Sequence, residues 1–327
     1  MAKITVLGSG GWGMALAISA YNNRHNVTLW TPFKEEADQL LEKHGNEKLL
    51  RGVVLPSGIK VTTDLSVVEG DDLTIIATPS VAVRSVAKQL ADYNDIGIIV
   101  NVAKGFEKGT LKFLTDVISE ELPNVDIVAF SGPSHAEEVA RNIPTSIVAA
   151  SKSQKAAETV QEIMSGGCLR VYTANDLIGV ELGGALKNVI AIAAGCCDGL
   201  GFGDNTKAAL ITRGIAEMAR LGISMGASEY TFAGLTGIGD LVVTCTSRHS
   251  RNNRFGYKVG SGVDIKTALE EVGTVEGYYA TEMAYELAKK QGVELPIINE
   301  CYALLYEGKP VNEVVKSLMT RPQKNEH

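Results

Sequence analysis

The chain has 327 residues, of which 45% are hydrophobic and 21% are charged, and its formal net charge is −7. This length supplies material for two hydrophobic cores, so we expect two domains. The net negative charge argues against a nucleic-acid partner, because phosphate groups would be repelled everywhere except at a local basic cluster.

The cysteines and histidines point to a reducing compartment and to no metal. The five cysteines form no C-x-x-C pair, and Cys196 and Cys197 are adjacent, which argues against a disulfide framework. His135 and His249 lie apart from any group with metal-ligand spacing. We find no signal-peptide pattern, and the most apolar stretch, residues 189–197, is too short to span a bilayer. We therefore expect a cytoplasmic protein with no membrane span.

The first predicted strand, residues 4–7, runs directly into the pattern G-x-G-x-x-G. Gly8 allows the tight turn, Gly10 lets the backbone approach a pyrophosphate, and Gly13 lets the following helix pack closely on the strand. The free N–H groups that open this helix would face the anion. The pattern predicts a dinucleotide site, and an ordinary tight turn is the alternative.

An apolar helix over 14–21 and a second strand over 27–30 complete the βαβ context that the glycine pattern needs. A NAD-specific fold usually has a carboxylate at the end of the second strand, where it binds the adenosine ribose 2′-hydroxyl. Here Glu35 and Glu36 lie further on, and Lys34 could meet a 2′-phosphate, so we expect NADPH to be favoured. If Lys34 only decorates an exposed loop, NAD remains open.

Strands and helices continue to alternate along the first half of the chain. The further predicted strands are 73–77, 96–102, 125–130, 145–150 and 169–172, with helices such as 81–91 and 111–120 between them. This alternation predicts a mainly parallel, doubly wound sheet. Ligands collect beyond the carboxyl ends of such strands, so we expect Gly8, Thr78, Lys104 and Gly132 to share one crevice.

Ser134 follows one of these strand ends and allows two interpretations. It could approach a ligand at the edge of the sheet. It also forms an S-x-x-E capping-box pattern with Glu137, which needs no ligand. The sequence leaves both open.

The pattern changes near Asp176, and only helices are predicted after it. They cover 178–194, 206–221, 228–233, 265–271, 280–290, 297–306 and 311–318. We therefore expect a Rossmann-like α/β domain over residues 1–176 and an all-α domain over residues 177–327.

Lys187 lies in the first of these helices, where its neighbours one turn away are Gly183, Gly184 and Ala191. A lysine beside so little bulk faces a gap or a ligand, and desolvation would favour the neutral amine that proton transfer needs. The alternative is a solvated charge, the commoner state of a helical lysine. Asp240 could orient Lys187, bind a substrate hydroxyl or close the glycine turn that precedes it.

Residues 244–254 form a basic segment that contains Arg248, Arg251 and Arg254, with hydroxyls and amides between them and no acid. Forked guanidinium donors among neutral donors suit a phosphate or a carboxylate. The alternative is a solvated, basic start of a helix.

Together these motifs resemble the bacterial-type NAD(P)-dependent sn-glycerol-3-phosphate dehydrogenase family over nearly the whole chain. The stretches that carry the resemblance are 8–13, 101–105, 131–134, 183–188, 235–240, 250–256 and 275–278. The resemblance implies a 6-phosphogluconate-dehydrogenase-like fold and a role in phospholipid precursor synthesis. Pro32 stands where the family often carries a polar or basic residue.

The resemblance also implies roles for single residues. Lys187 would be the proton donor and acceptor, with Lys104 and Asp240 as further catalytic residues. Cofactor contacts are implied for Gly8, Ser9, Gly10, Gly11, Trp12, Gly13, Phe33, Lys104, Ala136, Arg251, Val275 and Glu276. Substrate contacts are implied for Lys104, Gly132, Ser134, Lys187, Asp240, Ser250, Arg251 and Asn252.

The implied reaction is hydride transfer between NAD(P)H and dihydroxyacetone phosphate, which gives sn-glycerol 3-phosphate. The two domains would close over one pocket, with Lys187 protonating the alkoxide and the Arg251 segment anchoring the phosphate. A related dehydrogenase that prefers a carboxylate substrate, and a non-catalytic dinucleotide sensor, are the alternatives. The sequence is compatible with a homodimer but determines neither the oligomeric state nor the direction of the reaction in the cell.

Overall fold

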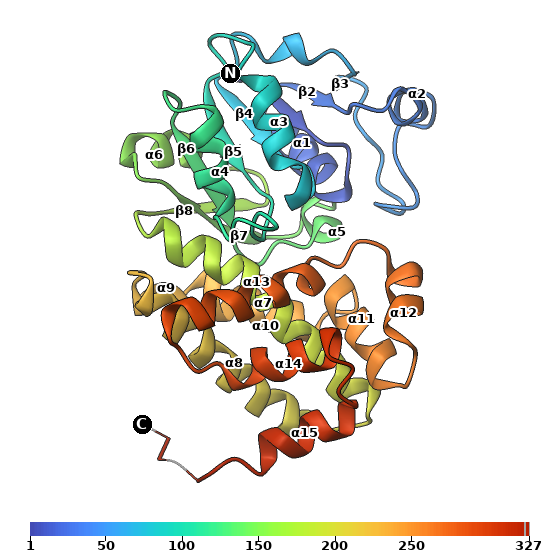
Figure 1. Ribbon diagram of the computed structural model, residues 1–327. Helices are drawn as coiled ribbons and strands as arrows, with labels where there is room; N and C mark the ends of the chain where they lie inside the picture. Colours follow the sequence, from blue (N-terminus) through green and yellow to red (C-terminus); the bar gives the residue numbers. More distant parts are fainter. Residues whose placement is uncertain (324, 327) are drawn as a thin grey trace. The chain divides into compact units, whose positions relative to one another are not determined.

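The computed structural model describes residues 1–323, 325 and 326 and divides the chain into two compact units, Met1–Glu181 and Leu182–His327 (Figure 1). The first unit contains one eight-stranded sheet in the order β3-β2-β1-β4-β5-β6-β7-β8. Its strands are β1 (Lys3–Leu7), β2 (Asn26–Trp30), β3 (Lys60–Thr62), β4 (Leu73–Ile76), β5 (Ile98–Asn101), β6 (Ile127–Ser131), β7 (Thr145–Ala150) and β8 (Leu169–Ala174). Neighbouring strands are parallel except β6 and β7. The predicted mainly parallel sheet is confirmed, and its first six strands have the order typical of dinucleotide-binding folds.

Helices cover both faces of this sheet because successive strand residues point to opposite sides. Val6 packs in a core with helix α1, whereas Leu7 packs in a separate core with α3 and α4. The helices of the first unit are α1 (Gly11–Asn22), α2 (Lys34–Lys43), α3 (Val83–Leu90), α4 (Leu114–Glu121), α5 (Ala136–Val139) and α6 (Gln154–Met164). The 3₁₀ turns η1 (Leu65–Val68) and η2 (Ser80–Ala82) lie between them.

The first unit corrects three local expectations. Helix α1 begins at Gly11 rather than at Met14, so the second half of the glycine pattern is already helical. Lys34 opens the helix α2 rather than lying in a loop. The sequence missed α2 because it buries only Ala37 and Leu40, which is too few apolar residues for a periodic pattern.

The second unit is helical in its described part, as predicted. Its elements are the long helix α7 (Leu177–Gly199), which begins in the first unit, α8 (Asp204–Ser224), α9 (Glu229–Phe232), the π-helical turn η3 (Leu235–Gly239), α10 (Asp240–Thr246), α11 (Arg251–Gly260), α12 (Ile265–Val272), α13 (Glu276–Gln291), α14 (Pro296–Tyr306) and α15 (Val311–Met319). Helices α10 and α11 are shorter or more polar than the predicted ones, and the sequence did not separate them from loops.

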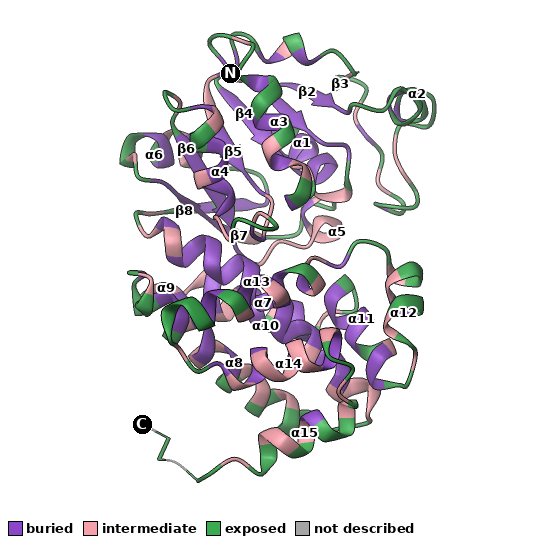
Figure 2. Ribbon diagram, in the orientation of Figure 1, coloured by how far each residue is buried: buried purple, intermediate pink, exposed green. Residues whose placement is uncertain are grey.

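Helix α7 is the central element of the second unit. By length and composition it could cross a membrane, but 83% of its most apolar window is buried within the structure, as in the core helices of soluble proteins (Figure 2). Glycines on α7 and on α11 allow the backbones of these two helices to approach closely. A Cβ at Gly195 would lie 2.0 Å from the Asn253 carbonyl oxygen, and a Cβ at Gly256 would lie 2.0 Å from that of Ile192.

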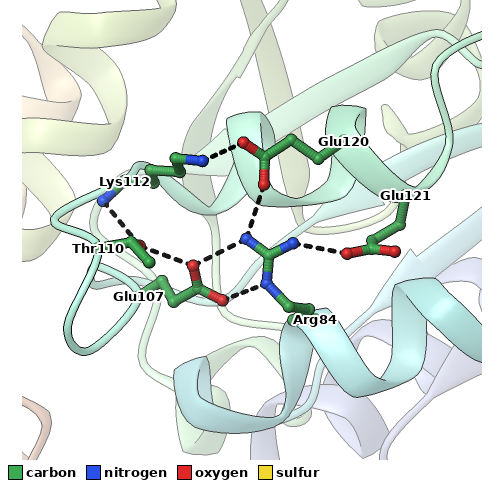
Figure 3. A network of polar contacts seen from close by, with 6 residues as sticks. All are labelled: Arg84, Glu107, Thr110, Lys112, Glu120 and Glu121. Carbon is green, nitrogen blue, oxygen red and sulfur yellow. Dashed lines mark hydrogen bonds and ion pairs between the residues drawn. The ribbon is translucent and has the colours of Figure 1, made fainter.

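An ion-pair network fixes the loop between β5 and α4 (Figure 3). Arg84 of α3 binds Glu107 of this loop through two nitrogens, at 2.5 and 2.8 Å, and Glu121 of α4 at 2.5 Å. Glu120 bridges Arg84 at 2.7 Å and Lys112 of the same loop. The hydrogen bonds from Arg84 lower the pKa of Glu107 to about 2. The loop between β5 and α4, which contains Lys104, is therefore tied to α3 and α4.

We expect Arg84→Met to lower the free energy of unfolding by about 1 kcal/mol at pH 7, since Arg84 joins three carboxylates but its side chain and those of its partners remain partly exposed to solvent. The pKa of Glu107 is lowered on folding, so its contribution is present above pH 4.5 and is lost as the pH falls toward 2. Denaturant unfolding between pH 8 and pH 3.5 measures the difference in free energy of unfolding between the variant and wild type. This difference should become smaller below pH 4.5. Lys152→Met, which removes an exposed lysine, is the control. A difference that does not change with pH would contradict this account.

Candidate active site

The loop after β1, which we call the cradle, is rich in glycine, and three of its glycines leave space that a side chain would fill or approach a neighbouring backbone closely. Gly8 has φ +124°, and a Cβ there would lie 2.7 Å from the Ala77 carbonyl oxygen. A Cβ at Gly13 would lie 2.0 Å from the Gly8 oxygen, so α1 approaches the strand end closely. Gly10 is the exposed N-cap of α1 and has no atom within 4 Å of a Cβ position. The first turn of α1 has no acidic residue, so its N–H groups suit a diphosphate.

Two buried polar groups beside this cradle have no hydrogen-bond partner among the described residues: Trp12 Nε1 in α1 and Thr78 Oγ1 after β4. Buried donors of this kind normally find a partner, and a bound ligand would supply one for both. A Cβ at Gly11 would lie 3.8 Å from that of Ala136, the first residue of α5, which places Ala136 next to the start of α1. The residues present therefore fit a dinucleotide.

Lys104, Gly132 and Ser134 meet at the same edge of the sheet. The Lys104 amine donates to the Gly132 carbonyl oxygen at 2.9 Å and to Ser134 Oγ at 3.2 Å. Ser134 Oγ donates to the Gly132 oxygen at 2.8 Å. The capping-box interpretation of Ser134 is wrong, because His135 is the N-cap of α5 and no side chain caps that helix. The serine hydroxyl is held by the lysine instead.

The end of β2 carries a carboxylate that the sequence did not place there. Glu36, in the first turn of α2, accepts hydrogen bonds from Ser9 Oγ at 2.6 Å and from Thr31 Oγ1 at 2.8 Å. Phe33 is the N-cap of α2 and is 60% exposed, and Lys34 is also exposed. The polar group fixed at this strand end is thus an acid, not Lys34.

Lys187 is buried, with 6% of its surface exposed, which excludes the solvated alternative. Its amine pairs with the carboxylate of Asp240, the first residue of α10, and donates to Thr244 Oγ1 at 3.0 Å. Thr244 lies one turn after Asp240 and donates to its carbonyl oxygen at 2.6 Å. Burial raises the pKa of the adjacent Cys245 thiol to about 12, so that residue adds no charge here. The pair is the contact that the first of the three roles predicted for Asp240 requires, namely that it orients Lys187.

The small residues around Lys187 have a packing cause. A Cβ at Gly183 would lie 2.5 Å from the Thr236 carbonyl oxygen, because the backbone of η3 rests against this part of α7. The gap beside Lys187 that its small neighbours predict is therefore partly filled by the main chain of residues 235–239. The same approach brings the start of α10, and with it Asp240, to Lys187. The glycine turn before Asp240 is a π-helical turn rather than a loop.

Three helices are joined by buried amides near the basic segment. Asn252 of α11 donates to Asn188 Oδ1 of α7 at 2.9 Å and accepts from the Gly277 N–H of α13 at 2.8 Å. Ser250 is the N-cap of α11, and its hydroxyl accepts from the Asn253 N–H at 3.2 Å. Ser250 and Asn252 thus have structural partners in addition to their predicted substrate contacts.

The remaining predicted residues of this unit lie at two helix starts. Arg251 is the first residue of α11 and is exposed, as are Arg248 and Arg254, and none of the three forms an ion pair within the described part of the chain. Arg251 thus lies at the exposed, basic start of a helix, where its guanidinium is available to an anion. Val275 is the buried N-cap of α13, and Glu276 is its first residue.

The predicted site residues form one group in each unit. The first contains Gly8, Ser9, Gly10, Gly11, Trp12, Gly13, Phe33, Lys104, Gly132, Ser134 and Ala136, and the second contains Lys187, Asp240, Ser250, Arg251, Asn252, Val275 and Glu276. Sequence reasoning missed Thr244 and Asn188. Thr244 could have been found from its spacing of four residues from Asp240 on one helix face, and Asn188 from its place beside Lys187.

Comparison with known proteins gives one consistent result. Residues 3–157 match the family model of the NAD-dependent glycerol-3-phosphate dehydrogenase N-terminus, and residues 176–316 match that of its C-terminus. The glycerol-3-phosphate dehydrogenase [NAD(P)+] of Fusobacterium nucleatum is 51% identical over 100% of this chain and 99% of that protein. The enzyme of the same name from Agathobacter rectalis is 49% identical, over 100% and 98%. The crystal structure of glycerol-3-phosphate dehydrogenase from Coxiella burnetii has a TM-score of 0.93 at 38% identity, covering 98% of this chain and 99% of that one.

The two loop glycines make a matched test of the cradle. We expect Gly13→Ala to lower the melting temperature without ligand, because its Cβ collides with the Gly8 oxygen. Gly10→Ala should keep the melting temperature, since its Cβ meets nothing, but should weaken binding of NADH about tenfold or more by blocking the pyrophosphate. Calorimetric titration and thermal unfolding measure the two effects. Unchanged NADH affinity in a folded Gly10→Ala would show that the cradle does not hold the dinucleotide.

Proposed function

The chain belongs to the NAD-dependent glycerol-3-phosphate dehydrogenase family, and we propose that it interconverts dihydroxyacetone phosphate and sn-glycerol 3-phosphate with NAD(P)H or NAD(P)+. The observation that carries this proposal is the buried amine of Lys187, fixed by Asp240 and Thr244 in a stretch that also carries the family resemblance. A dinucleotide sensor has no need for a buried acid–base pair. The full-length similarity to enzymes of one name favours dihydroxyacetone phosphate over a carboxylate substrate.

In the proposed mechanism, the first unit binds the dinucleotide through Gly8, Gly10 and the start of α1. When bound, the nicotinamide supplies the hydride that reduces the ketone carbon. Lys187 donates a proton to the oxygen of that carbon and takes it back in the reverse direction. Asp240 holds the amine in place and stabilises its charged form before transfer, and Thr244 fixes the rotamer of the amine. Turnover thus needs residues of both units.

The substrate phosphate is assigned to the basic start of α11. Arg251 supplies a forked donor at a helix N-terminus, where the helix dipole also favours an anion. Ser250 and Asn252 flank it, and their backbone positions are fixed by the bonds to Asn253, Asn188 and Gly277. Lys104 and Ser134, at the sheet edge of the first unit, are also assigned to substrate binding.

We also propose that the protein acts in the cytoplasm, has no membrane span and provides a phospholipid precursor. The buried state of α7 supports the second point. A homodimer is part of the same proposal, and sedimentation equilibrium measures it directly. None of these points affects the assignment of the reaction.

The reaction is tested by following oxidation of NADH and of NADPH with dihydroxyacetone phosphate. We expect turnover with this substrate and at least about a hundredfold lower kcat/KM with phosphate-free dihydroxyacetone, because the phosphate contacts orient the ketone. A 2-keto acid serves as the rival substrate. Faster oxidation with the 2-keto acid, or none with dihydroxyacetone phosphate, would contradict the proposal.

We expect Lys187→Ala to lower kcat about 10²–10⁴-fold while NADH binding is kept, because the amine transfers the proton and does not belong to the nucleotide cradle. The variant leaves the Asp240 carboxylate buried without its cation, which destabilises the protein. Lys187→Met combined with Asp240→Leu removes the pair together and provides a second inactive variant with less strain. Lys289→Ala, on an exposed face of α13, is the control. Near-normal turnover in a folded Lys187→Ala variant would show that Lys187 is not the proton donor.

A further inference from the structure

The carboxylate of Glu36 stands beyond the carboxyl ends of two neighbouring strands. Ser9 follows β1 and Thr31 follows β2, and the last residues of these strands, Leu7 and Trp30, are register partners. Both hydroxyls donate to Glu36, at 2.6 and 2.8 Å. Ser9 and Thr31 are themselves buried, so the carboxylate is held by a fixed base. In folds of this strand order, the adenosine ribose of the dinucleotide lies at this strand end.

The bonds that hold Glu36 leave half of its carboxylate available. Ser9 and Thr31 both donate to the same oxygen, Oε2, and Oε1 has no partner within the described part of the chain. Glu36 is an exposed residue, at the first turn of α2. An acid in the first turn of α2 also interacts favourably with the helix dipole, but that interaction does not require the two hydroxyls. The geometry is that of an acceptor positioned for a ligand.

We propose that Glu36 receives the 2′-hydroxyl of the adenosine ribose and thereby makes this chain select NAD(H) over NADP(H). A ribose hydroxyl can donate to the free carboxylate oxygen, whereas a 2′-phosphate would meet a like charge. The hydroxyls of Ser9 and Thr31, which could otherwise donate to a phosphate, are already bonded to Glu36. This inference rests on the proposed function, and it opposes the NADPH preference that Lys34 indicates in the sequence.

The test compares binding of NADH and NADPH to the full-length protein by calorimetric titration, without substrate. We expect NADH to bind at least about tenfold more tightly, the lower end of what one hydrogen bond to a charged group contributes. Glu36→Gln keeps an acceptor for both hydroxyls and removes the charge. Glu36→Gln should lower the ratio of the NADPH dissociation constant to the NADH dissociation constant at least about tenfold, chiefly by strengthening NADPH binding.

Glu35→Gln is the matched control, because it removes the same charge from the neighbouring, exposed position of α2. It should leave the ratio of the two affinities within about twofold of wild type, as expected for a solvated charge outside the site. Glu36→Ala provides a second variant if Glu36→Gln does not fold, and thermal unfolding checks both. ADP-ribose and its 2′-phosphate serve as probes that lack the nicotinamide.

Two outcomes would overturn the proposal. Wild-type protein that binds NADPH as tightly as NADH would exclude discrimination at this strand end. An unchanged ratio in folded Glu36→Gln and Glu36→Ala would assign the carboxylate a structural role only. Failure to bind either nucleotide would instead contradict the proposed function itself, so the two failures are distinguishable.

Discussion

The buried pair of Lys187 and Asp240 is the interaction on which the proposed chemistry of this chain depends. A lysine with 6% of its surface exposed is tolerated because its amine contacts a carboxylate and a hydroxyl. Removing either charge from such a pair typically costs about 3–5 kcal/mol. The helices around this pair must therefore hold both side chains in place, and the packing of the second unit does so.

That packing relies on small residues rather than on large apolar ones. Gly183 lets the backbone of η3 rest on α7, and this contact sets the start of α10 and therefore the position of Asp240. Gly195 and Gly256 allow α7 and α11 to pack backbone to backbone. A methyl group at any of these positions would meet a neighbouring backbone atom and push these elements apart.

The first unit must bind an anionic dinucleotide although the protein carries a net negative charge. It uses backbone N–H groups at the start of α1 and glycines with no side chains in the way, so few cations are needed. Lys104 is fixed by Gly132 and Ser134 at the carboxyl edge of the sheet. The network around Arg84 fixes the loop that follows Lys104, so the edge is rigid where a ligand would meet it.

The sequence by itself determined the fold class and the glycine-rich loop, and it singled out Lys187 as a lysine among small and apolar residues, because each of these features is encoded locally. Hydrophobic periodicity gave most helices and every strand except the short β3, and the spacing of Gly8, Gly10 and Gly13 defines one backbone geometry. Helix α2 and the short helices α10 and α11 were missed, since their apolar positions are too few for a periodic signal.

Only the tertiary structure decided which polar groups meet. Asp240 is 53 residues from Lys187, and Glu36 is 27 from Ser9, so neither contact leaves a local pattern. The structure also shows that Ser134, for which the sequence left two interpretations open, contacts Lys104, and it placed an acid rather than Lys34 at the end of β2. Local spacing specifies backbone shape, whereas long-range pairing depends on how the elements pack, and that information is spread over the whole chain.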